Sequence, residues 1–89
     1  MTEAQILKEA IKTFGEKHQE KMAVEECSEL ITAISHKHRG REHNIVEEIA
    51  DVEIMLEQLK IINNCQYQVA MIRKRKVERL LNKIIEKSL

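Results

Sequence analysis

The sequence predicts an all-α fold, and three observations support this prediction. The 89 residues include no proline and two glycines, so little interrupts a helix. Apolar residues recur every three or four positions along most of the chain, which is the spacing of one buried helix face. Hydrophobic residues make up 43% and charged residues 34% of the sequence, a balance typical of a folded helical domain. We expect a single domain over residues 1–89, built as a four-helix bundle.

The predicted bundle is small. A chain of this length can bury only a limited core, and neighbouring subunits often supply what it lacks. We therefore expect oligomerisation to complete the bundle, as a homodimer or a homotetramer.

The first helix is predicted over residues 3–14. Thr2 and Gln5 have the spacing of a capping box, in which two side chains satisfy free backbone groups at a helix start. Gly15 marks the end of the helix. Between these signals the apolar residues at helical spacing are Ile6, Leu7, Ala10, Ile11 and Phe14.

The second helix is predicted to begin at residue 17 or 18 and to end at His38, with Gly40 as the C-terminal stop. Its apolar face consists of Ala23, Cys27, Leu30, Ile31 and Ile34. Glu26 and Glu29 lie at the edge of this face. Carboxylates in such a position can point into a cleft beside the core.

The third helix is predicted to begin with a capping box formed by Asn44 and Glu47 and to end at Asn63-Asn64. Its main apolar face consists of Ile45, Ile49, Val52, Leu56 and Leu59. A second stripe consists of Ala50, Ile54 and Ile61. A helix that is apolar on two sides needs a neighbour on each side, and we expect one neighbour to be another subunit.

The fourth helix follows a short link. Its apolar positions are Val69, Ile72, Val77, Leu80, Leu81, Ile84 and Ile85. No linker, low-complexity segment or internal repeat divides the chain, which agrees with a single domain.

Four acidic residues form two pairs with the same spacing. Glu26 and Glu29 share one helix face, and Glu48 and Asp51 share a face of the next helix. The chain between the pairs is long enough to turn at Gly40, so antiparallel helices can bring both pairs together. Because like charges repel, the arrangement makes best sense with a cation among them. Oxygen ligands favour Mg²⁺, with Mn²⁺ as a substitute.

The spacing alone leaves open that these acids merely decorate solvated helix faces. Three features favour a site: the acids repeat, they border apolar stripes, and Glu26 and Asp51 have no basic residue one turn later for an ion pair. The first acids of the two doublets, Glu25 and Glu47, are rotated by about 100° from these positions. We expect supporting roles for them.

The motif Glu25-Glu26-x-x-Glu29, followed by Glu48-x-x-Asp51, resembles the signature of the MazG-like nucleoside triphosphate pyrophosphohydrolases. The resemblance extends to His18-Gln19, to residues 50–59 and to residues 76–80, and so covers nearly the whole chain. It implies an all-α fold in which the four acids bind magnesium. It also implies hydrolysis between the α- and β-phosphates of a nucleoside triphosphate, giving a monophosphate and pyrophosphate.

The resemblance further implies substrate-binding roles for Lys76 and Arg79, which match basic positions of the family, and for His18, in a region where relatives shape the nucleotide pocket. Ordinary alternatives stay open: a basic helix end for the first two and a surface histidine for the third. The residue that deprotonates the attacking water stays unassigned, because any metal-bound carboxylate could serve. Base selectivity is also open, since Phe14 and Tyr67 are the only aromatic residues.

Composition excludes several classes of protein. Zero net charge and a lack of interleaved aromatic residues argue against binding to nucleic acid. No apolar run is long enough for a membrane span, and the N-terminus lacks a signal-peptide pattern, so we expect a cytoplasmic protein. Cys27 and Cys65 form neither a disulfide framework nor a zinc motif. His36, His38 and His43 are expected to face solvent.

Two other functions compete with hydrolysis. A non-catalytic helical oligomerisation or regulatory module would need the apolar stripes but not the acids. A ferritin-like di-iron protein would use Glu-x-x-His on two helices. No glutamate in this sequence has a histidine three residues later, so the di-iron alternative ranks low.

Overall fold

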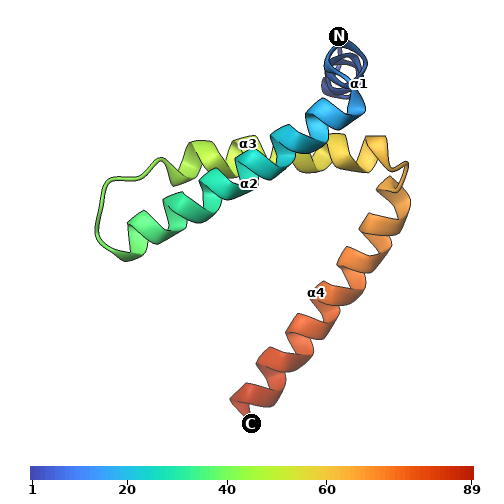
Figure 1. The fold of residues 1–89 in the computed structure, drawn as a ribbon. Coiled ribbons are helices and arrows are strands. Elements are labelled where there is room, and N and C mark those ends of the chain that lie inside the picture. Colours follow the sequence, from blue (N-terminus) through green and yellow to red (C-terminus); the bar gives the residue numbers. More distant parts are fainter.

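In the computed structural model, which describes every residue from Met1 to Leu89, the chain forms four helices and no strand (Figure 1). The helices are α1 (Glu3–Phe14), α2 (Glu16–His38), α3 (Ile45–Ile62) and α4 (Gln66–Ser88). The predicted all-α class and the number of helices are confirmed. None of the helices is long and apolar enough to cross a membrane.

The capping box predicted at the start of α1 is present. Thr2 Oγ1 accepts a hydrogen bond from the Gln5 backbone N–H at 3.2 Å, and Gln5 Oε1 accepts one from the Thr2 N–H at 2.8 Å. Gly15 separates α1 from α2 with a φ of +92°, a conformation that side-chain-bearing residues rarely adopt. The chain can therefore change direction between the two helices within a single residue.

The capping box predicted at the start of α3 is wrong. The Asn44 side chain does not cap the helix. The Ile45 N–H instead donates to His43 Nδ1 at 3.3 Å, and Asn44 Nδ2 donates to the Glu48 side chain one turn later. The Asn44 side chain therefore bonds a residue one turn into the helix and does not cap the backbone groups of the helix start.

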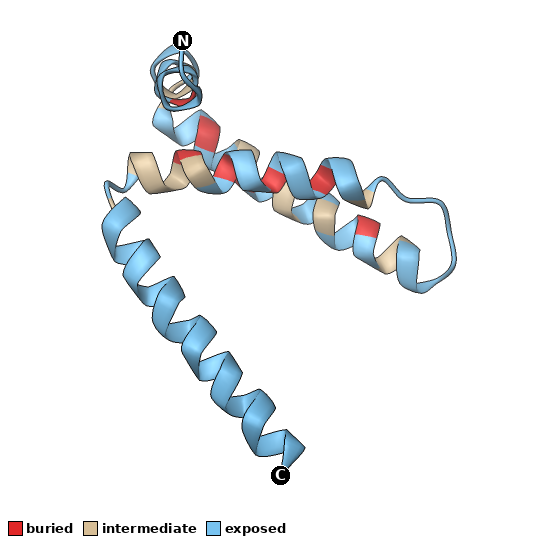
Figure 2. Cartoon of the chain, turned by 180° about the vertical axis from the view of Figure 1, so that it is seen from behind, coloured by how far each residue is buried: buried red, intermediate tan, exposed pale blue.

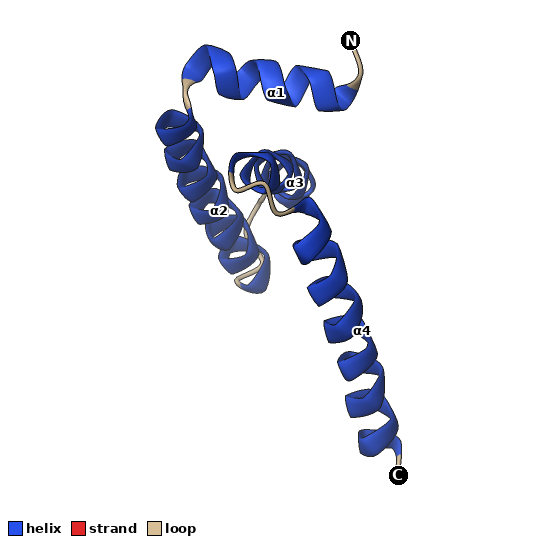
Figure 3. Cartoon of the chain, turned by 90° about the vertical axis from the view of Figure 1, so that its right-hand side faces the viewer, coloured by secondary structure: helices blue, strands red, loops and turns tan.

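Helices α2 and α3 run antiparallel, side by side, and form the main contact of the fold (Figure 1). Helix α1 lies across them and contacts both, as Figure 3 shows from the side. Helix α4 contacts α3 alone and projects away from the other helices. The single chain thus forms a three-helix unit with one extended helix, and closure into a four-helix bundle stays a prediction.

The buried residues lie mainly in the seam between α2 and α3, and none lies in α4 (Figure 2). Eight of 89 residues are buried, which is few for a self-sufficient domain. The apolar ones are Leu7, Ala23, Ala33, Val52 and Met55, and the polar ones are Gln19, Glu48 and Gln58. The predicted need for further subunits is consistent with this small core, but oligomerisation itself stays a prediction.

The face of α3 that packs on α2 differs from the predicted one. Val52 is buried as expected, but Ile49 and Leu56 of the predicted face are 45% and 47% exposed. Glu48, Met55 and Gln58 are buried instead. The helix is therefore rotated, so that Glu48, predicted at the edge, lies within the seam.

Candidate metal centre

Three of the four predicted metal ligands come together between α2 and α3. Glu26 and Glu29 are one turn apart on α2, and Glu48 lies in the first turn of α3. One carboxylate oxygen from each lies within 4.8 Å of the others. Antiparallel packing of the two helices brings these residues together, because the middle of α2 passes the start of α3.

Two carboxylate oxygens in this cluster have no hydrogen-bond partner. Oε2 of Glu26 and Oε2 of Glu48 are both buried and unpaired. The Glu48 side chain is nine-tenths or more buried, at 5% exposure, and its other oxygen accepts a hydrogen bond from Asn44 Nδ2 at 2.8 Å. A buried oxygen without a partner is costly unless something else binds it.

The surroundings of the cluster disfavour the ionised form of two of its carboxyl groups. Burial, followed by the nearby charge of Glu29, raises the pKa of Glu26 above its ordinary value. Burial and then the Glu29 charge likewise raise the pKa of Glu48, and the Asn44 hydrogen bond opposes this. Ionised carboxylates at this position therefore need a compensating positive charge.

No basic side chain of the chain supplies that charge. The one ion pair joins Lys60 and Glu57, in the last part of α3. The donor set of Glu26, Glu29 and Glu48 consists of oxygens alone, which hard cations such as Mg²⁺ and Mn²⁺ prefer. The two unpaired buried oxygens and the lack of an internal cation make the cluster a fitting site for such an ion.

Asp51, the fourth predicted ligand, lies beside the other three without joining their closest group. Its side chain is exposed, and its charge contributes to raising the pKa of both Glu26 and Glu48. It is therefore near enough to add negative charge to the cluster. Glu25 and Glu47 are exposed and make no side-chain hydrogen bond, so the structure gives neither of them a contact that would support the cluster.

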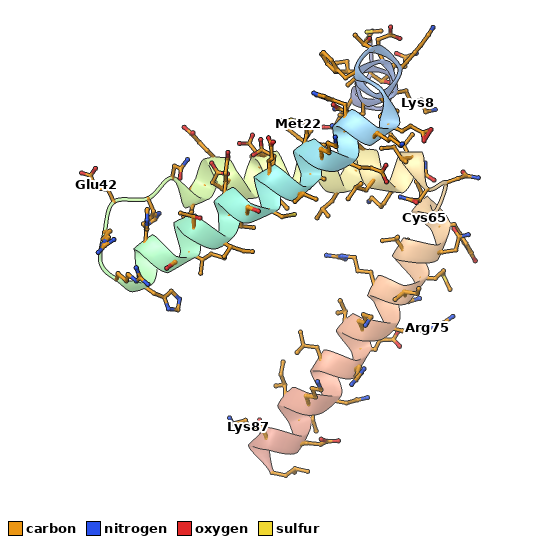
Figure 4. All side chains as sticks on the ribbon, in the orientation of Figure 1. Lys8, Met22, Glu42, Cys65, Arg75 and Lys87 are labelled. Atoms are coloured by element: carbon orange, nitrogen blue, oxygen red, sulfur yellow. The ribbon has the colours of Figure 1, made fainter.

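The predicted substrate-binding residues lie apart from the cluster in the single chain. Lys76 and Arg79 are exposed on α4, which contacts neither α1 nor α2. Figure 4 shows two other basic residues of this projecting helix, Arg75 in its middle and Lys87 near its C-terminal end. His18 is exposed near the start of α2, where its ring centroid lies 5.8 Å from that of Phe14. The substrate-binding roles stay predictions.

A polar hollow of about 460 Å³ adjoins the cluster. Its lining consists of Ser28, Glu29, Thr32, Ala33, His36, Asn44 and Glu48. His36, expected to face solvent, is half-buried and lines this hollow, whereas His38 and His43 are exposed as expected. The sequence analysis did not include Asn44 in the site. Its position four residues before Glu48 could have indicated a contact, because residues four apart lie on the same helix face.

A buried amide pair fixes the seam at the other end of the helices. Gln19 Nε2 donates to Gln58 Oε1 at 2.7 Å, and both side chains are buried. Gln19 Oε1 also accepts a hydrogen bond from His18 Nδ1 at 2.8 Å. Because each buried amide needs a partner, this pair favours one register of α2 against α3 and so helps to align the acids.

Fold and site together define an all-helical protein with a partly buried acidic cluster between two antiparallel helices. Comparisons with protein-family models, with curated proteins and with solved structures gave no match to the chain. The resemblance of the sequence motifs to the MazG-like family therefore stays a prediction.

Proposed function

We propose that the protein is a magnesium-dependent hydrolase that converts nucleoside triphosphates to monophosphates and pyrophosphate. The observation that carries the proposal is the pair of buried, unpaired oxygens of Glu26 and Glu48 beside Glu29, with no basic residue of the chain to neutralise them. This arrangement suits a cation. The resemblance to MazG-like enzymes assigns the cation to triphosphate hydrolysis.

In this proposal the acids bind the cation, and one of them accepts the proton of the attacking water. Glu26 and Glu48 bind through the oxygens that the fold leaves unpaired, Glu29 contributes a third carboxylate, and Asp51 completes the set. When bound, Mg²⁺ neutralises phosphate charge and lowers the pKa of the attacking water. Glu29 is the exposed member of the three clustered acids, so it reaches both the cluster and solvent. It is the acid best placed to accept the proton from water.

The substrate phosphates need positive charge, for which Lys76 and Arg79 are the candidates. Within one chain α4 does not contact α2, so these residues would reach the cluster through a second copy. The proposal therefore includes a homodimer or a homotetramer in which α4 of one subunit approaches the α2–α3 seam of another. It also includes a cytoplasmic location, where nucleoside triphosphates and magnesium are both available.

The reaction class is tested by identifying the products. A panel of ribo- and deoxyribonucleoside triphosphates is incubated with the protein, with magnesium or with excess chelator, and the phosphorus products are separated. The proposal predicts monophosphate and pyrophosphate with magnesium and no turnover with chelator. Diphosphate and orthophosphate would place cleavage at the other phosphoanhydride and contradict the proposal.

A non-catalytic oligomerisation module is the second candidate, and the exposed apolar residues of α4 favour it. No residue of this helix is buried, and Ile72, Leu80 and Ile84 are 48%, 56% and 56% exposed. Such a module would bind its partner without the acids. Partner binding that survives Glu48→Gln, together with no turnover of any triphosphate, would favour this second function.

A further inference from the structure

We infer that Asn44 is a positioning residue, which holds Glu48 so that one of its oxygens is free to bind the cation. The inference rests on the proposed function, because it concerns the same cluster. Asn44 Nδ2 donates to Glu48 Oε1 at 2.8 Å, and Glu48 Oε2 is buried without a partner. One oxygen of Glu48 is thus tied to Asn44 and the other is free. A carboxylate oxygen of Glu48 also lies within 4.8 Å of oxygens of Glu26 and Glu29.

The position of Asn44 in the helix supports this role. Asparagine before a helix start ordinarily uses its side-chain oxygen to accept a backbone N–H, which stabilises the helix. Asn44 makes no such bond, and His43 Nδ1 accepts the Ile45 N–H instead. The Asn44 amide therefore bonds the Glu48 carboxylate and does not cap the helix end.

The surroundings of Asn44 point in the same direction. Its side chain lines the polar hollow beside the cluster, together with Glu29 and Glu48. A hydrogen bond to one oxygen of a metal-binding carboxylate fixes the orientation of that carboxylate, and loss of such a partner typically weakens metal binding about 10–100-fold.

Two substitutions separate positioning from helix capping. Serine caps a helix start as well as asparagine does but has no amide to reach Glu48, whereas glutamine keeps the amide and caps poorly. If Asn44 positions Glu48, then Asn44→Ser weakens binding of Mn²⁺ by about tenfold or more, while Asn44→Gln stays closer to wild type. If Asn44 only stabilises the helix, Asn44→Gln weakens Mn²⁺ binding more than Asn44→Ser does.

The test is calorimetric titration of the full chain with Mn²⁺ alone, without nucleotide. Asn82→Ser on the exposed surface of α4 is the matched control and should bind Mn²⁺ as wild type does. Wild-type affinity in Asn44→Ser, or a loss in Asn44→Gln as large as that in Asn44→Ser, would overturn the inference but not the proposed function. Absence of Mn²⁺ binding by the wild-type protein would overturn both.

Discussion

Glu48 has the least ordinary environment of any acid in the chain. It is buried in the helix seam, one oxygen is bonded to Asn44, and the other has no partner. Its nearest charged neighbours are acids, including Glu29 and Asp51. An ionised Glu48 destabilises the folded chain when no cation is bound. A bound cation makes the same carboxylate stabilising.

Glu48→Gln should therefore raise the melting temperature of the metal-free protein and blunt its response to magnesium. A cation at ~100 times its Kd stabilises a folded chain by about 2.7 kcal/mol, which corresponds to roughly 11–22 °C in Tm for a domain of this size. Glu47→Gln is the matched control, because it removes a charge from the same helix turn outside the cluster. Thermal melts with magnesium and with chelator measure both effects, and equal magnesium shifts in Glu48→Gln and wild type would contradict the assignment.

The raised pKa values of Glu26 and Glu48 predict how metal-free stability depends on pH. Both groups bind a proton more tightly in the folded chain than in the unfolded chain, so lowering the pH through the raised pKa towards the ordinary glutamate value favours folding. The Tm in chelator should rise as the pH falls from neutrality towards this window. Glu48→Gln should show a smaller rise, and melts of both proteins across the range test this. An equal change of Tm with pH in the two proteins would mean that Glu48 does not contribute to the pH dependence of stability.

At the scale of the helices, the link between α1 and α2 depends on Gly15. Its φ of +92° is strained for any residue with a Cβ, although the space around it is open. Gly15→Ala should therefore cost about 1–3 kcal/mol through the backbone alone. Gly40→Asn is a suitable comparison, because asparagine tolerates the left-handed φ of +67° at that position. Chemical denaturation measures both, and an unchanged stability for Gly15→Ala would mean that the link adopts another conformation.

Local signals in the sequence were sufficient for several helix ends but not for the helix faces. The capping box at Thr2 and the glycines at 15 and 40 mark ends that the structure confirms. Helix α3, however, is apolar on more than one side, so its periodicity allowed several rotations. The rotation that occurs buries Glu48 and Gln58, and Gln58 finds its partner Gln19 on another helix. The apolar pattern of a single helix cannot predict this hydrogen bond between Gln19 and Gln58, because it joins two helices.

At the scale of the whole molecule, the shape is extended. Helix α4 projects from the end of α3, and the chain buries few residues (Figures 1 and 2). The convergence of Glu26, Glu29 and Glu48 could be predicted, because it needs only two antiparallel helices. The position of Lys76 and Arg79 relative to the acids could not, because it depends on the direction of α4 and on any second copy.

Burial of α4 against another copy predicts a mass in solution that is a multiple of 10.4 kDa. Leu80→Glu should shift the protein towards smaller species, because it places a charge on the apolar face that includes Val69 and Val77. Asn82→Glu adds the same charge about 200° around the helix and should change little. Light scattering after size-exclusion chromatography measures the masses. A monomeric wild-type protein would contradict this prediction.

If the acidic cluster carries out the chemistry, Glu29→Gln should slow the release of pyrophosphate. Glu20→Gln, an exposed substitution on the same helix, is the control. With saturating magnesium and triphosphate, we expect at least about a 100-fold loss of rate for Glu29→Gln and a wild-type rate for Glu20→Gln. A Glu29→Gln protein that releases pyrophosphate at the wild-type rate would show that the acidic cluster does not carry out the chemistry.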